Sequence, residues 1–187
     1  AVRDAILLAV GQHDRNPDPM MWVRSAWGSL LLELWYDAKL REVYKAFVKR
    51  KKEQPCSLEQ FVAIGHSSGG TGIYNVLKKG KTFQKAGRFA PAYFGMIDTI
   101  IAHGHDLTDK AGWTTVEHYH APKTKTIKGI RNIPIPGVGH YSILKNQKMI
   151  QEMAKAAAQA YLKKVKEEIN NNPSWDPWDT RPPPNGW

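Results

Sequence analysis

The sequence predicts an α/β fold in which a mostly parallel sheet of about six strands carries helices on both faces. Short apolar runs alternate along the chain with segments of helical spacing, and continuous apolar runs are typical of strands that are buried on both faces. The length of 187 residues fits one domain, and a hydrophobic content of 42% is ordinary for a globular protein.

The expected strands lie at residues 5–10, 30–35, 61–64, 92–97, 114–119 and 130–135, and the first four of these are mostly apolar runs. The expected helices lie at residues 38–52, 68–79 and 142 to about 169, with a shorter one at 17–27. From residue 170 the chain turns rich in asparagine, proline and tryptophan, a composition that cannot continue the sheet. We therefore expect one α/β domain over residues 1–169 and a tail over residues 170–187, which either wraps around the domain or binds a partner.

Basic residues outnumber acidic residues by 27 to 17, which gives a net charge of +10. The excess of basic residues lies in the segments 39–52, 78–85 and 145–166. Such clusters are typical of solvated helix faces, and the alternative explanation is that they attract an anionic surface. No nucleic-acid-binding motif accompanies these segments, and no apolar run approaches the roughly 20 residues of a membrane-spanning helix. We expect a soluble protein, either cytoplasmic or secreted after removal of a leader, and the sequence leaves its oligomeric state open.

Residues 65–70 read Gly-His-Ser-Ser-Gly-Gly and match the pattern Gly-x-Ser-x-Gly around Ser67. The motif follows an expected strand and precedes an expected helix, so the chain has to turn sharply at the serine. Such a turn leaves no room for side chains two residues before and after the serine, and Gly65 and Gly69 meet this demand. Ser68 has no glycine two residues before it, so Ser67 is the candidate nucleophile.

A nucleophilic serine needs a base to take its proton and an acid to orient that base. His140 follows the last expected strand, in Pro-Gly-Val-Gly-His, and is the candidate base. Asp98 directly follows the expected strand 92–97, which places its carboxylate at the carboxyl edge of the sheet, and it is the candidate acid. Asp106 and Asp109, farther along the same loop, remain alternatives.

The oxyanion of an acyl-transfer reaction needs two preorganised backbone N–H donors. The N–H of Ser68, at the start of the expected helix, is one candidate. The second is the N–H of Gln12, in the loop after the first expected strand, where Gly11 lets the backbone approach a substrate.

At these motifs the sequence resembles the α/β-hydrolase superfamily, in particular small bacterial or phage-type lipases, esterases and cutinase-like enzymes. The resemblance extends from about Ile6 to Tyr161 and is carried by residues 8–12, 65–70, 97–98 and 137–140. It implies a minimal α/β-hydrolase that cleaves a small-molecule or lipid ester through an acyl-enzyme, without a cofactor. The sequence does not indicate the acyl or alcohol specificity, and amides, thioesters and polyesters remain alternative substrates.

Two other functions compete with this interpretation. Histidines two residues apart, His103 with His105 and His118 with His120, have a spacing that metal ligands also use, which leaves a metal-dependent hydrolase open. The other alternative is a catalytically inactive hydrolase-fold module, whose basic surface and tryptophan-rich tail bind an anionic polymer or a membrane surface.

Overall fold

The computed structural model describes residues 26–54, 58–79, 89–101 and 104–171. They form an α/β fold with a parallel four-stranded sheet, in the order β1-β2-β3-β4. The strands are β1 (Val62–His66), β2 (Tyr93–Ile97), β3 (Thr115–His120) and β4 (Arg131–Pro134). The helices in the described ranges include α2 (Ala26–Glu53), α3 (Ser68–Lys78) and α5 (Gln147–Asn171), and a short 3₁₀ helix, η3 (Ser142–Lys145), precedes α5.

The register of the sheet brings the carboxyl ends of its strands to one edge. His66 pairs with Ile97, Ile97 pairs with Tyr119, and His120 pairs with Pro134. Ligands of open parallel sheets bind beyond this edge, so the loops that leave it are where chemistry is expected.

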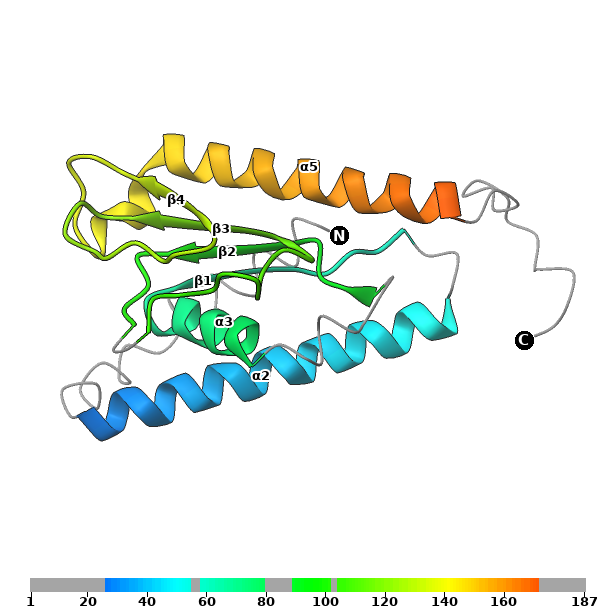
Figure 1. Cartoon of the computed structure of the whole chain (residues 1–187), viewed down its shortest axis with the longest axis horizontal. Helices are drawn as coiled ribbons and strands as arrows, with labels where there is room; N and C mark the ends of the chain where they lie inside the picture. The colour runs from blue at the N-terminus through cyan, green and yellow to red at the C-terminus, as the bar shows by residue number, and fades with distance from the viewer. Residues whose placement is uncertain (1–25, 55–57, 80–88, 102–103, 172–187) are drawn as a thin grey trace, which may run out of the picture.

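Alternate residues of the strands belong to two separate core clusters. One cluster joins Phe94 and Met96 of β2 to α3 and α2, through side chains that include Tyr74, Leu77 and Phe47. The other joins Tyr93 and Ile97 of β2 to α5, through side chains that include Met149, Met153 and Ala157. Figure 1 shows the corresponding arrangement, with α5 along one side of the sheet and α3 and α2 along the other. These two layers hold the strands, and thereby their carboxyl ends, in place.

The expected strand at 30–35 is wrong, because these residues lie inside α2. The run is rich in leucine rather than in β-branched residues, and a mostly apolar run of six residues cannot by itself distinguish a strand from a buried helix segment. The following residues are good helix formers, and no proline interrupts them before α2 ends, so helix propagation includes the run. The expected elements at 5–10 and 17–27 lie outside the described residues, except that α2 takes in the last two residues of the latter. The described sheet therefore has four strands rather than about six.

The expected helix over 142–169 is divided into η3 and α5. The division comes at Asn146, whose side-chain oxygen accepts a hydrogen bond from the N–H of Met149 at 2.9 Å and so caps the start of α5. The expected buried side of this helix comprises Ile150, Met153, Ala157, Tyr161 and Val165. Met153 and Ala157 are indeed buried, but Ile150 is 41% exposed, and Met149 and Ala160 are buried in addition. The helix ends at Asn171, and the remainder of the expected tail lies outside the described residues.

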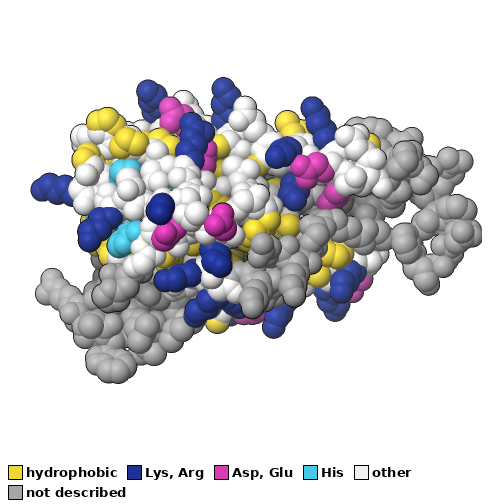
Figure 2. Space-filling view, in the orientation of Figure 1, with side chains coloured by type: hydrophobic (Ala, Val, Ile, Leu, Met, Phe, Trp, Pro, Cys, Tyr) yellow, Lys and Arg dark blue, Asp and Glu magenta, His cyan; other side chains and the backbone are white. Residues whose placement is uncertain are grey.

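Lysine and arginine side chains are scattered over the visible face of the molecule, along α5 as well as along α2 (Figure 2). Several of them pair with carboxylates one helical turn away, such as Lys39 with Glu42 at 2.8 Å. Within the described ranges, no helix combines the length and the apolar character needed to cross a bilayer.

Candidate active site

Ser67 occupies the turn between the end of β1 and the start of α3. Its backbone has φ 53° and ψ −119°, a conformation that is strained for a residue with a side chain. The N–H of Ser67 continues the sheet by donating to the carbonyl of Ile97 at 2.9 Å, and its own carbonyl accepts from the N–H of Thr71 at 3.1 Å. Strand and helix bonds thus hold the strained residue from both sides.

The glycines of the motif are required by close packing at this turn. A Cβ atom on Gly65 would overlap the backbone carbonyl of Gly69, and one on Gly70 would overlap the side-chain oxygen of Thr99. Strand, helix and the loop after β2 therefore approach one another at a distance that only glycine permits.

Asp98 is the first residue after β2 and also has a positive φ, of 42°. Its N–H donates to the carbonyl of Tyr119 at 2.7 Å. One carboxylate oxygen accepts from the N–H of Ala121 at 2.8 Å and from the hydroxyl of Thr124 at 2.5 Å, and the side chain is 2% exposed. The carboxylate is thus fixed in place, with its second oxygen directed at His140.

His140 lies in the loop between β4 and η3 and stands between the other two side chains. Its Nδ1 lies 2.6 Å from Oδ2 of Asp98, and its Nε2 lies 3.0 Å from Oγ of Ser67. Because a carboxylate only accepts hydrogen bonds, Nδ1 carries the proton that Asp98 binds, and Nε2 is left to accept the serine hydroxyl proton. The three predicted residues therefore come together in a continuous chain of hydrogen bonds.

The pKa of Asp98 lies below its ordinary value. Burial alone raises the pKa of this carboxyl, but the hydrogen bonds from Thr124, from the N–H of Ala121 and from His140 outweigh it. Asp98 is therefore ionised at neutral pH and can stabilise a positive charge on His140.

Of the two expected oxyanion donors, Ser68 begins α3, so its N–H belongs to the first turn, whose N–H groups have no partner within the helix. Gln12 lies outside the described residues.

The alternative acids are not brought to the site. Asp106 is exposed, accepts from the N–H of Thr108 at 2.8 Å and lies 3.8 Å from Lys128. Asp109 is exposed as well. Asp98 is the carboxylate that contacts His140.

The described histidines that the sequence suggests as metal ligands are not arranged around a common metal position. His118 and His120 share a face of β3 and stack with their ring centroids 5.2 Å apart. Both nitrogens of His118 are engaged, one with Asn132 at 3.2 Å and one with the N–H of Thr99 at 3.3 Å. Among the residues that the structure describes, no group of three His, Cys, Asp or Glu side chains could hold a metal ion, and His103 lies outside them.

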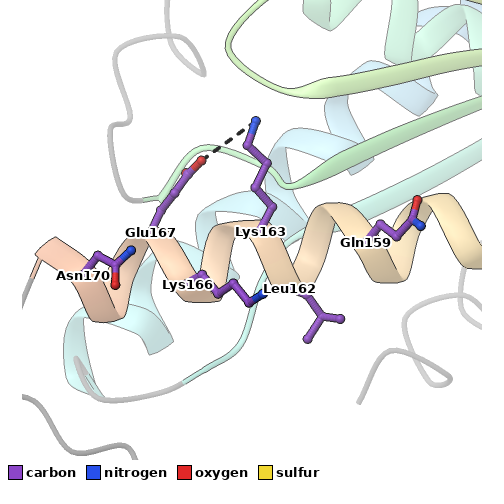
Figure 3. A pocket seen from close by; sticks show the side chains of 6 residues that line it. All are labelled: Gln159, Leu162, Lys163, Lys166, Glu167 and Asn170. Carbon is purple, nitrogen blue, oxygen red and sulfur yellow. Dashed lines mark ion pairs between the residues drawn. The ribbon is translucent and has the colours of Figure 1, made fainter.

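A shallow depression lies elsewhere, along the second half of α5 (Figure 3). Its lining consists of Gln159, Leu162, Lys163, Lys166, Glu167 and Asn170. At a rise of 1.5 Å per residue, this region starts about 18 Å along the helix from the end nearest His140. It holds one ion pair, between Lys163 and Glu167, and brings together no set of nucleophilic or acid–base side chains.

Two contacts of the site are not predicted from the sequence. Thr124 holds the carboxylate of Asp98, and His66 binds the main-chain carbonyl of His140 at 2.8 Å. The position of His66 next to the nucleophile is the available signal for the second contact, whereas nothing in the sequence marks Thr124.

Comparison of the chain with protein-family models, with curated proteins and with solved structures finds no match in any of the three.

Proposed function

We propose that this protein is a serine hydrolase that cleaves a carboxylic ester through an acyl-enzyme. The observation that carries the proposal is the hydrogen-bonded chain from Asp98 through His140 to the strained Ser67. This arrangement of nucleophile, base and orienting acid is what acyl transfer by serine requires, and it is recognised by geometry rather than by position in the chain. The resemblance of the motifs to small α/β-hydrolases supports the same reaction.

In the first half of the reaction, Oγ of Ser67 attacks the ester carbonyl carbon while its proton passes to Nε2 of His140. Asp98 stabilises the resulting imidazolium through Nδ1–H. The tetrahedral oxyanion is held by backbone N–H groups, with Ser68 as one donor. Collapse of the intermediate breaks the bond to the alcohol, which leaves with the proton from Nε2.

In the second half, water attacks the acyl-enzyme and gives a proton to Nε2. The carboxylic acid leaves, and Oγ of Ser67 recovers its proton. The histidine thus acts first as base and then as acid in each half.

The test is the hydrolysis of p-nitrophenyl esters of several acyl lengths by the wild-type protein and by Ser67→Ala. We expect turnover that Ser67→Ala reduces at least about 10³-fold. Thr115→Ala is the control, because it also removes a hydroxyl, but from the first residue of β3, at the amino edge of the sheet and so at the opposite edge from Ser67. Equal turnover by the wild type and Ser67→Ala would contradict the proposal, and abolition by a chelator would favour a metal-dependent hydrolase.

A further inference from the structure

The imidazole of His66 is directed at the loop that carries His140. Its Nε2 lies 2.8 Å from the main-chain carbonyl oxygen of His140, and because a carbonyl only accepts, Nε2 carries the proton of this bond. The two rings lie 4.7 Å apart at an interplanar angle of 34°. His66 therefore contacts both the backbone and the side chain of the candidate base.

The loop of His140 needs such a contact because of where it starts. It leaves β4, at the opposite edge of the described sheet from β1, and has to cross three strand spacings, about 14 Å, to reach Ser67. At its start, the N–H of Ile135 is held by the carbonyl of His120 at 2.9 Å. Beyond that point, within the part of the chain that the structure describes, the hydrogen bond from His66 is the one that ties the main chain of residues 136–141 to the sheet.

The position of His66 follows from the alternation of β1. Val62 and Ile64 pack against the core cluster beneath α5, and side chains two residues apart share a face of a strand. His66 therefore stands on the face beneath α5, where the loop of His140 arrives, whereas Ser67 turns away into the nucleophile turn. A hydrogen-bond donor at the residue before the nucleophile can thus set the position of the base directly.

We propose that His66 is a positioning residue, whose Nε2–H holds the backbone of His140 so that the imidazole of His140 spans Asp98 and Ser67. The inference rests on the proposed function, because the base has to meet both partners in one orientation. The hydrogen bonds of the His140 ring, 2.6 Å to Asp98 and 3.0 Å to Ser67, allow the ring little displacement. A shift of about 1 Å in a reacting group costs roughly 100-fold in rate.

Two variants separate the hydrogen bond from the ring contact. His66→Gln keeps an N–H donor at about the distance of Nε2 but removes the ring, whereas His66→Phe keeps a ring beside His140 but removes the donor. We expect kcat to fall roughly 10- to 100-fold in His66→Phe, with KM within about threefold of wild type, and to stay within about threefold in His66→Gln. Melting temperatures of both variants establish that each is folded.

A spectroscopic measurement tests the same claim without any substrate. The proton on Nδ1 of His140, held against Asp98, is expected to give a low-field proton NMR resonance in the wild type. The resonance should persist in His66→Gln and broaden or vanish in folded His66→Phe. A resonance and a kcat that survive in His66→Phe, or that are lost equally in folded His66→Gln, would overturn the role of the donor.

The two proposals can fail separately. A wild-type protein that hydrolyses no ester contradicts the proposed function, and the NMR comparison still decides whether His66 positions His140. An active wild type with an equally active His66→Phe contradicts the positioning role alone.

Discussion

His118 accepts a hydrogen bond at Nε2 from the main-chain N–H of Thr99, across 3.3 Å. Its Nδ1–H donates to the side-chain oxygen of Asn132 at 3.2 Å, so the ring is neutral and fully engaged. Thr99 follows Asp98, which means that a buried, neutral histidine holds the backbone beside the acid of the candidate triad.

This arrangement predicts a pH-dependent stability. Burial lowers the pKa of His118 to about 4, whereas an unfolded histidine titrates near 6.5. Between these values the unfolded chain binds a proton that the folded protein does not, so the free energy of unfolding falls as the pH is lowered, by about 3 kcal/mol in total. Urea unfolding from pH 8 to pH 4 measures this, and His118→Leu, although less stable throughout, should show a shallower decline. An unchanged decline in His118→Leu would show that another group is responsible.

Asp98→Asn tests the choice of acid. The substitution keeps the shape of the side chain but removes the charge and the preference for a proton on Nδ1 of His140, so we expect kcat/KM for an ester to fall about 10³- to 10⁴-fold. Asp106→Asn is the matched control and should stay within about twofold, because Asp106 is exposed and has no contact with His140. The reverse pattern would assign the acid to Asp106.

Gly65→Ala tests the packing of the nucleophile turn. Its added methyl group would overlap the backbone of Gly69, which cannot move without displacing α3, and we expect a loss of about 3 kcal/mol in the free energy of unfolding. Gly112→Ala is the control, because a Cβ there meets nothing within 4 Å, and we expect a change within about 0.5 kcal/mol. Denaturant titration of both variants measures the difference, and equal stabilities would refute the close approach.

Lys51→Met tests a buried ion pair that joins the two helical layers. Lys51 of α2 is 1% exposed and donates to Glu168 of α5 and to the carbonyl of Glu59, both at 2.8 Å. Removing the ammonium leaves the carboxylate of Glu168 uncompensated, which we expect to cost about 3 kcal/mol. The exposed neighbour Lys52→Met should change the free energy of unfolding by less than about 0.5 kcal/mol, and a similar small value for Lys51→Met would contradict the pairing.

The sequence predicts which residues meet at the candidate site more accurately than it predicts the helices and strands around them. Ser67, Asp98 and His140 are identifiable because each has to follow the carboxyl end of a strand, and the four strands of the described sheet lie at or near four of the expected positions. The run 30–35 is misassigned because its apolar character suits a helix equally well, and the neighbouring residues decide between the two. The expected burial of Ile150 is wrong as well, because helical periodicity alone does not decide which of the neighbouring apolar residues Met149 and Ile150 is buried. The bonds of His66, Thr124 and His118 depend on which loops meet in space, and no local pattern contains that information.

The proposed acyl transfer depends most directly on the reactivity of the Ser67 hydroxyl. Intact and peptide mass spectrometry after treatment with a fluorophosphonate measures it, with His140→Ala as the comparison. We expect one covalent adduct, on Ser67, in the wild-type protein, and labelling slowed at least about 10³-fold in His140→Ala. A folded wild-type protein that forms no adduct, or one that is labelled at another residue, would contradict the account.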